Sequence, residues 1–162
     1  MKLSLNDITK KSNVVKICLA CSPGGHMLQM QQLFQIYKSY NRFYLTFERE
    51  MSKELSKKER VVLISDSRRS PIRLFKNIFQ SLMVFLRERP DIVIANGGGF
   101  VVPFCYISKI FRKKLIFIES FSRVEEPSWS GKLLHPITDL FIVQWKPILK
   151  YYKKAVYGGS IF

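Results

Sequence analysis

The sequence lacks the features that mark several specialised classes of protein. No apolar run reaches the roughly 18–20 residues that span a bilayer. Only three cysteines occur, Cys18, Cys21 and Cys105, too few and odd in number for a disulfide scaffold. Neither a G-x-G-x-x-G fingerprint, a P-loop nor an Asp-x-Asp pair is present. We therefore expect no cofactor and no metal, and we interpret the cysteines as buried apolar residues of a protein in a reducing cytoplasm.

Acidic residues are also scarce. Asp and Glu total 12 against 27 Lys and Arg, which gives a formal net charge of +15. Such a charge suits nucleic acid, an anionic membrane surface or an anionic substrate, or is simply a solvated surface. The basic residues form three clusters: Arg68, Arg69, Arg73 and Lys76; Lys109, Arg112, Lys113 and Lys114; Lys146, Lys150, Lys153 and Lys154. Aromatic residues lie beside these clusters, which favours contact with a partner that is both apolar and anionic.

A chain of 162 residues with 47% hydrophobic residues is long enough for one domain with a real core. The polar segment 1–13 contains no long apolar stretch, so we expect neither a signal peptide nor a membrane anchor there. The domain is expected to cover residues 14–162. There are no internal repeats and no linker.

Apolar, β-branched runs alternate with helical patterns along the chain. The predicted strands are 14–20, 43–47, 61–65, 91–95, 115–119, 140–144 and 155–157. The predicted helices are 27–37, 71–89, 100–111 and 146–152, with a helix or loop at 48–58 and a short helix within 120–136. Continuously apolar strands that alternate with helices are typical of a parallel sheet buried on both faces. The fold class is therefore α/β: a single Rossmann-like domain with a mostly parallel sheet.

Two glycine-rich loops follow predicted strands. They are Ser22-Pro23-Gly24-Gly25-His26 and Asn96-Gly97-Gly98-Gly99. Glycine lets the backbone approach a ligand closely, and free N–H groups at a helix start favour an anion such as phosphate. Because the carboxyl ends of parallel strands meet at one edge of a sheet, we expect both loops to face one crevice. The alternative for each loop is a plain tight turn.

His26 is the sharpest signal in the first loop, because a helix start lowers the pKa of an imidazole and favours the neutral base. It is a candidate general base or a hydrogen-bond donor to a phosphate; the alternative is a structural histidine. Glu119 and Ser120 follow the fifth strand and are expected at the same crevice. Glu119 is a candidate base or ligand of sugar hydroxyls, or else pairs with Arg123. Arg123 itself is a candidate phosphate ligand.

The predicted helix 71–89 has an unusually wide apolar arc, which includes Ile72, Phe75 and Phe79. One interpretation is a core helix between the sheet and a neighbour. The other is a helix that packs inward with one edge and meets lipid or a partner with the other.

Several motifs together resemble one family. They are the loop 22–26 with Met27-Leu28-Gln29-Met30, the loop 96–99, Glu119-Ser-Phe-Ser-Arg-Val124, Pro127-Ser-Trp-Ser-Gly-Lys-Leu-Leu134, Asp139-Leu-Phe-Ile-Val-Gln-Trp145 and Ala155-Val-Tyr-Gly-Gly159. The family is that of bacterial capsule and exopolysaccharide glycosyltransferase subunits. It is similar to the membrane subunit of the eukaryotic two-chain N-acetylglucosamine transferase that extends lipid-linked oligosaccharides. The resemblance covers about residues 14–162.

The resemblance implies the amino-terminal half of a GT-B glycosyltransferase that is split into two chains. This half binds a polyprenyl-diphosphate-linked saccharide, and a companion subunit binds the UDP-sugar. The chain alone is then expected to transfer little or no sugar. The eukaryotic relative has a membrane span that is not seen here, so attachment to the cytoplasmic face of the cell membrane is expected to be peripheral.

The residues expected to carry these roles fall into three groups. The catalytic candidates are His26 and Glu119, and the acceptor or phosphate ligands are Ser22, Gly24, Gly25, Asn96, Gly97, Gly98, Gly99, Ser120 and Arg123. The membrane contacts are Arg68, Arg69, Arg73, Lys76, Phe75 and Phe79. The alternatives are a basic nucleic-acid-binding α/β module and a stand-alone nucleotide-binding enzyme. The first lacks a recognisable nucleic-acid motif and leaves the glycine loops unexplained, so no nucleic-acid partner is expected.

Overall fold

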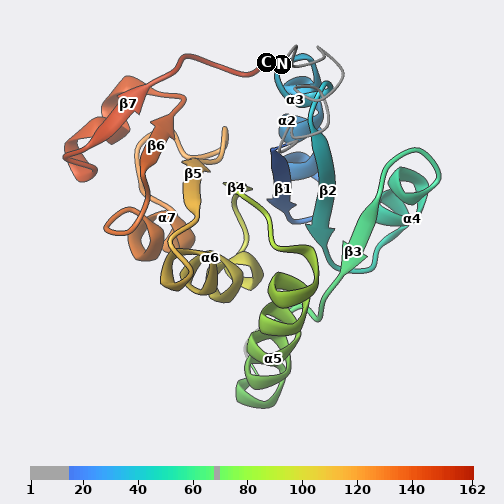
Figure 1. The fold of residues 1–162 in the computed structure, drawn as a ribbon. Helices are drawn as coiled ribbons and strands as arrows, with labels where there is room; N and C mark the ends of the chain where they lie inside the picture. Colours follow the sequence, from blue (N-terminus) through green and yellow to red (C-terminus); the bar gives the residue numbers. More distant parts are fainter. Residues whose placement is uncertain (1–14, 68–69) are drawn as a thin grey trace, which may run out of the picture.

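A seven-stranded parallel sheet forms the centre of the structure, a computed structural model that describes residues 15–67 and 70–162 (Figure 1). Its strands are β1 (Lys16–Cys21), β2 (Asn41–Thr46), β3 (Val61–Leu63), β4 (Ile92–Asn96), β5 (Lys114–Ile118), β6 (Leu140–Val143) and β7 (Ala155–Tyr157). They lie in the order β3-β2-β1-β4-β5-β6-β7, and every neighbouring pair is parallel. The predicted fold class is confirmed. Segment 1–13, Val14 at the start of the predicted first strand, Arg68 and Arg69 lie outside the described residues.

Strand β1 is buried because it lies between β2 and β4, and its side chains alternate between two cores. Cys18 and Ala20 join the large core under one face of the sheet, whereas Leu19 and Cys21 join a smaller core on the other face. Cys18 and Cys21 therefore point to opposite faces of the sheet. All three cysteines are buried and free, as predicted.

The helices are α2 (Gly25–Gln32), α3 (Phe34–Tyr37), α4 (Glu50–Ser56), α5 (Pro71–Glu88), α6 (Val102–Ile110) and α7 (Trp129–Leu134), with 3₁₀ turns η1 (Gly99–Val101) and η2 (Lys146–Tyr151). The predicted helix 27–37 is divided at Leu33. The turn there brings Tyr37 inward, where its hydroxyl donates to the Met30 carbonyl at 2.7 Å and contacts the Tyr44 hydroxyl at 2.7 Å. The predicted helix 146–152 is a 3₁₀ turn. None of the described helices is long and apolar enough to cross a membrane.

Helix α5 begins as predicted, with Ser70 as the capping residue and Pro71 at its first position. Its buried side is unexpected, because it is formed by Asn77, Ser81, Phe85 and Glu88. Asn77 is satisfied there, since its side-chain amide donates to the Ser65 carbonyl at 2.7 Å.

The apolar stripe of α5 faces solvent, so the interpretation as a core helix is wrong for this stripe. Ile72 is 82% exposed, Phe75 74% and Phe79 65%. Met83 and Leu86 continue the stripe and are also exposed.

A buried carboxylate fixes the end of α5 to the sheet. The oxygens of Glu88 accept hydrogen bonds from Lys16 Nζ at 2.7 Å, Arg60 at 2.7 Å and Arg87 Nε at 2.9 Å. Burial alone would raise the pKa of Glu88, but the hydrogen bonds from Lys16 and Arg87 outweigh it and hold the pKa below the usual glutamate value. These contacts tie α5 to β1 and to the turn before β3.

Candidate functional site

The first glycine loop turns the chain from β1 into α2. Gly24, the residue before the helix, has φ = 102°, a conformation that a residue with a Cβ rarely adopts. Gly25 begins the helix and is exposed. The loop therefore allows α2 to begin immediately after the buried strand and places His26 in the first turn of the helix.

His26 is held by the two glycine loops together. Its Nδ1 lies 2.8 Å from the Ser22 hydroxyl, and its ring packs against Gly97 in the second loop. Burial is the main reason why the pKa of His26 lies below the usual histidine value. The nearby Arg123 lowers it further, while Glu119 acts in the opposite direction. The imidazole is therefore neutral at pH 7, as a base must be.

The second glycine loop follows β4, the strand beside β1. Gly97 and Gly98 have φ = 60° and φ = 81°, so both need the left-handed region. A Cβ on Gly97 would overlap the His26 ring, so the close approach of the loops also requires glycine there. Asn96 is fully buried behind the loop, and its amide donates to Gln29 Oε1 at 3.3 Å.

The loops meet at a cavity of about 220 Å³, at the carboxyl ends of the strands. Six predicted site residues line it: His26, Gly97, Gly98, Gly99, Ser120 and Arg123. Ser122, Ser128, Trp129 and Ser130 complete its lining. The predicted crevice is thus present. It is lined by residues that follow β1, β4 and β5, and the strand order reverses between β1 and β4, the kind of place where ligands bind in open α/β sheets. Ser22, Gly24, Gly25, Asn96 and Glu119 do not line it.

Glu119 lies behind the cavity, with 0% of its surface exposed. Its Oε1 accepts from the Ser120 amide at 2.9 Å, and its Oε2 accepts from the Tyr152 hydroxyl at 2.6 Å and from the amide and hydroxyl of Ser128 at 3.2 and 3.1 Å. Neutral donors thus satisfy this carboxylate, and the structure records no Arg123–Glu119 ion pair among the described residues. This geometry favours a positioning role for Glu119 over contact with substrate; its catalytic role stays a prediction.

A buried amide cluster beneath the cavity was missed by sequence reasoning. Gln29 Oε1 accepts from the Phe121 amide at 3.1 Å and from Gln144 Nε2 at 2.8 Å, in addition to Asn96. Gln144 Oε1 in turn accepts from the Ile161 amide at 3.0 Å. The cluster joins α2, β4, the loop after β5 and the end of the chain. Its partners are far apart in sequence, so no local pattern indicated it.

Gly131 was also missed. A Cβ at this position would overlap the Glu119 carboxylate and the Tyr152 hydroxyl, so only glycine lets α7 approach them.

The basic clusters differ in how many of their charges are already paired. Lys109 and Lys114 both pair with Asp139, and Lys113 pairs with Asp91. This cluster therefore largely neutralises acidic groups of the chain itself.

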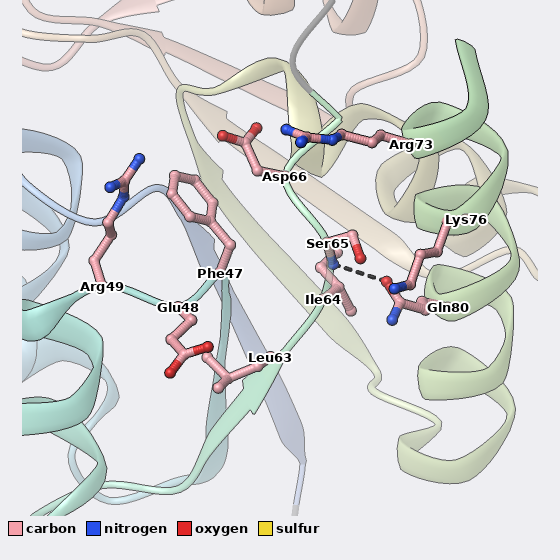
Figure 2. A pocket seen from close by; sticks show the side chains of 10 residues that line it. All are labelled: Phe47, Glu48, Arg49, Leu63, Ile64, Ser65, Asp66, Arg73, Lys76 and Gln80. Carbon is pink, nitrogen blue, oxygen red and sulfur yellow. Dashed lines mark hydrogen bonds between the residues drawn. The ribbon is translucent and has the colours of Figure 1, made fainter. Parts of the chain in front are cut away.

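Arg73 and Lys76 have another setting. They line a second cavity of about 480 Å³, between α5 and the segments after β2 and β3 (Figure 2). Figure 2 shows their side chains extending from α5 toward the cavity, with Asp66 opposite Arg73.

The described residues contain no group of three or more His, Cys, Asp or Glu side chains that could hold a metal.

Comparison with known proteins gives one family. The model for "Oligosaccharide biosynthesis protein Alg14 like" matches residues 17–161. UDP-N-acetylglucosamine transferase subunit ALG14 of Candida albicans is 37% identical over 97 residues, 56% of this chain and 44% of the relative. The human subunit of the same name is 38% identical over 91 residues, 52% of this chain and 42% of the relative. The chain therefore matches less than half the length of these relatives.

Solved structures agree on the fold. MurG of Acinetobacter baumannii superposes with a TM-score of 0.69 at 12% identity, over 82% of this chain and 42% of MurG. UDP-N-acetylglucosamine 2-epimerase of Rickettsia bellii gives a TM-score of 0.73 at 13% identity, over 92% of this chain and 46% of the epimerase. The described domain thus has the fold of roughly half of a GT-B protein.

Proposed function

This chain belongs to the Alg14-like family of oligosaccharide biosynthesis proteins, and we propose that it is the acceptor-binding subunit of a two-chain glycosyltransferase. In this proposal it holds a polyprenyl-diphosphate-linked saccharide, and a companion subunit brings the UDP-sugar. The relatives are named as subunits of a UDP-N-acetylglucosamine transferase, so UDP-N-acetylglucosamine is the first donor to test. The capsule or exopolysaccharide setting rests on the sequence resemblance alone.

The observation that carries the proposal is the convergence of His26, three glycines and Arg123 on one cavity. Backbone N–H groups of the glycine loop and the guanidinium of Arg123 suit the acceptor diphosphate. The neutral imidazole suits removal of a proton from the attacking sugar hydroxyl. That step requires the tautomer in which Nδ1–H donates to the Ser22 hydroxyl and Nε2 is free to accept the proton.

One face of the sheet offers a place for the companion. On one side of β5 and β6, Leu115, Phe117 and Phe141 are buried in the large core. Ile116, Leu140 and Ile142 point to the other side and are only partly covered. They line an apolar cavity of about 290 Å³ together with Leu33 and Ile161. Parallel sheets are normally covered on both faces, so we propose that the companion completes this one.

The proposal is tested by transfer assays with a tagged chain. We expect the pure chain to transfer no sugar from labelled UDP-N-acetylglucosamine to a polyprenyl-diphosphate sugar, and activity to appear once the co-purifying companion is added. Leu140→Lys is expected to abolish both companion binding and activity. Ile110→Lys, a matched change at an exposed site on α6, is expected to abolish neither. Robust transfer by the pure chain would contradict the proposal.

We further propose that α5 holds the protein at the cytoplasmic face of the cell membrane, as a peripheral contact. Its exposed stripe places Phe75 and Phe79 where they can enter the headgroup region. Arg73 and Lys76, exposed on the side of α5 that lines the 480 Å³ cavity, supply charge for anionic lipids in this proposal. Arg68 and Arg69 stay predicted contacts outside the described residues.

Vesicle flotation tests this contact. Each basic residue near an anionic surface is worth about 1 kcal/mol, so replacing Arg73 and Lys76 by Gln is expected to weaken binding about 30-fold. Lys53→Gln on α4, combined with Lys57→Gln at the residue that follows this helix, removes the same charge elsewhere and serves as the control. Binding to anionic but not neutral vesicles, reduced by salt, is expected. Equal binding to both vesicle types would assign the contact to another surface.

A further inference from the structure

Trp129 is a large apolar residue whose side chain is exposed to solvent, so it contributes little to the stability of the fold. It is the first residue of α7, it is 80% exposed, and it lines the 220 Å³ cavity at the glycine loops. A solvent-exposed indole forgoes most of the stabilisation that burial of so large an apolar side chain provides. Its position at the rim of the candidate site therefore points to a bound group.

The backbone on both sides of Trp129 is fixed. Ser128 and Ser130 are buried, and their hydroxyls lie 3.2 Å apart. Ser128 donates to the buried Glu119 through both its amide and its hydroxyl, and its hydroxyl accepts from the Gly131 amide at 2.9 Å. The backbone that carries the exposed ring is thus held rigidly by these hydrogen bonds. Less conformational entropy of this segment is therefore lost when a ligand binds.

The groups around the indole define the chemistry of the occupant. Ser122, Ser130 and Arg123 line the same cavity and offer hydroxyl and guanidinium donors beside the apolar ring. A sugar ring has matching surfaces: a C–H face for the electron-rich face of the indole and a rim of hydroxyls for the polar groups. The cavity is smaller than the roughly 300–1,000 Å³ of drug-sized pockets, so it suits no more than one sugar ring with the phosphate groups attached to it.

We propose that Trp129 is the stacking platform for the first sugar of the acceptor, the ring that carries the diphosphate. The proposal rests on the proposed function and deepens it. In it, the glycine loop and Arg123 hold the diphosphate, while Trp129 sets the plane of the ring. Trp129 thereby determines which hydroxyl of the sugar faces His26. A sugar whose C–H face is interrupted by an axial hydroxyl stacks less well, so Trp129 also contributes specificity.

The chain contains only two tryptophans, which makes a direct test possible. Trp145 is half-buried and donates from Nε1 to the Phe121 carbonyl at 2.7 Å. The Trp145→Phe variant leaves Trp129 as its single indole. We expect N-acetylglucosamine 1-phosphate, glucose 1-phosphate or galactose 1-phosphate to change the emission of this variant in a saturable way. The Trp129→Phe variant, which reports only from Trp145, is expected not to respond.

A second measurement uses the otherwise native chain, so it holds even if Trp145→Phe does not fold. Amide signals of Gly97, Gly98 and Gly99 report ligand binding by NMR. Trp129→Leu is expected to weaken binding of the responding sugar phosphate about threefold to tenfold, the size of an aromatic contact. Trp129→Phe is expected to retain most of the affinity. Binding of inorganic pyrophosphate is expected to be the same in all three proteins.

The outcomes separate the platform from the proposed function. If pyrophosphate shifts the glycine amides but no sugar phosphate alters Trp129 emission, the platform is overturned and the anion site stands. If neither probe binds, the proposed function fails as well. If Trp129 emission shifts to the blue with phospholipid vesicles and ignores the sugar phosphates, Trp129 contacts the bilayer and the platform is overturned.

Discussion

Gly97→Ala is expected to damage the site through one contact, the one between Gly97 and His26. The new methyl group would overlap the imidazole, and alanine would be forced into φ = 60°. The left-handed conformation costs about 1–2 kcal/mol and the overlap about 1–3 kcal/mol. We therefore expect a loss of about 3 kcal/mol in the free energy of unfolding, or a Tm lower by roughly 6–12 °C for a domain of this size.

A double-mutant cycle isolates the steric part. In a His26→Ala background the ring is absent, so Gly97→Ala should cost only the backbone strain of about 1–2 kcal/mol. Gly99→Ala is the matched control in the same cavity wall, because its φ is not in the left-handed region and nothing lies within 4 Å of a Cβ there. Gly99→Ala should lower the free energy of unfolding by no more than about 0.5 kcal/mol.

Urea unfolding followed by circular dichroism measures all of these variants. The NMR signals of the His26 ring should show, in addition, whether Gly97→Ala breaks the contact with Ser22. Equal costs of Gly97→Ala with and without the His26 ring would refute the reasoning, because they would mean that the two residues do not touch.

Three further predictions address the site and its support. His26→Ala should reduce transfer by the assembled enzyme about 10²–10⁴-fold without unfolding the chain, whereas His135→Ala, at the second histidine of the sequence, which does not line the cavity, should not reduce transfer; near-normal turnover of the first variant would make His26 structural. Arg123→Gln should raise the pKa of His26 toward the usual histidine value in an NMR titration, since Arg123 helps to lower it; an unchanged pKa would contradict the geometry. Glu88→Gln should cost about 2–3 kcal/mol at pH 7 in urea unfolding, because it leaves three cations around a neutral group. The pKa of Glu88 is lowered in the folded state, so this contribution exists above the ordinary glutamate pKa and is lost as the pH falls through that value toward the folded one; equal cost at low and neutral pH would disprove it.

The strands could be predicted from the sequence, and so could the position of the two glycine loops at one cavity. The strands were predictable because buried parallel strands are continuously apolar, and their shared edge then followed from topology. The boundaries moved by only a few residues: the predicted 155–157 strand is unchanged, and the predicted 43–47 strand is observed as Asn41–Thr46.

The orientation of α5 was not predictable, because a wide apolar arc does not specify which side meets the sheet. The deciding contacts are distant in sequence: Asn77 is held by Ser65, and Glu88 by Lys16 and Arg60. The burial of Glu119 has the same origin, since Ser128 immediately precedes α7 and Tyr152 immediately follows η2. In the sequence, a carboxylate that follows a strand gives the same pattern whether it contacts a ligand or is buried behind the cavity and supports its wall.

The pairing of β1 with β4 also has a consequence for how the chain is made in the cell. Ile17 pairs with Ile92, so one edge of this buried strand waits for a partner that is translated much later. At about 5–20 residues per second, the delay is roughly 4–15 s. During that time β1 and β2 can form only a sheet with an open edge, which is prone to pair with other chains. The nascent chain is therefore expected to need a chaperone until β4 emerges, and the edge that carries the candidate site is complete only after β5 has joined the sheet.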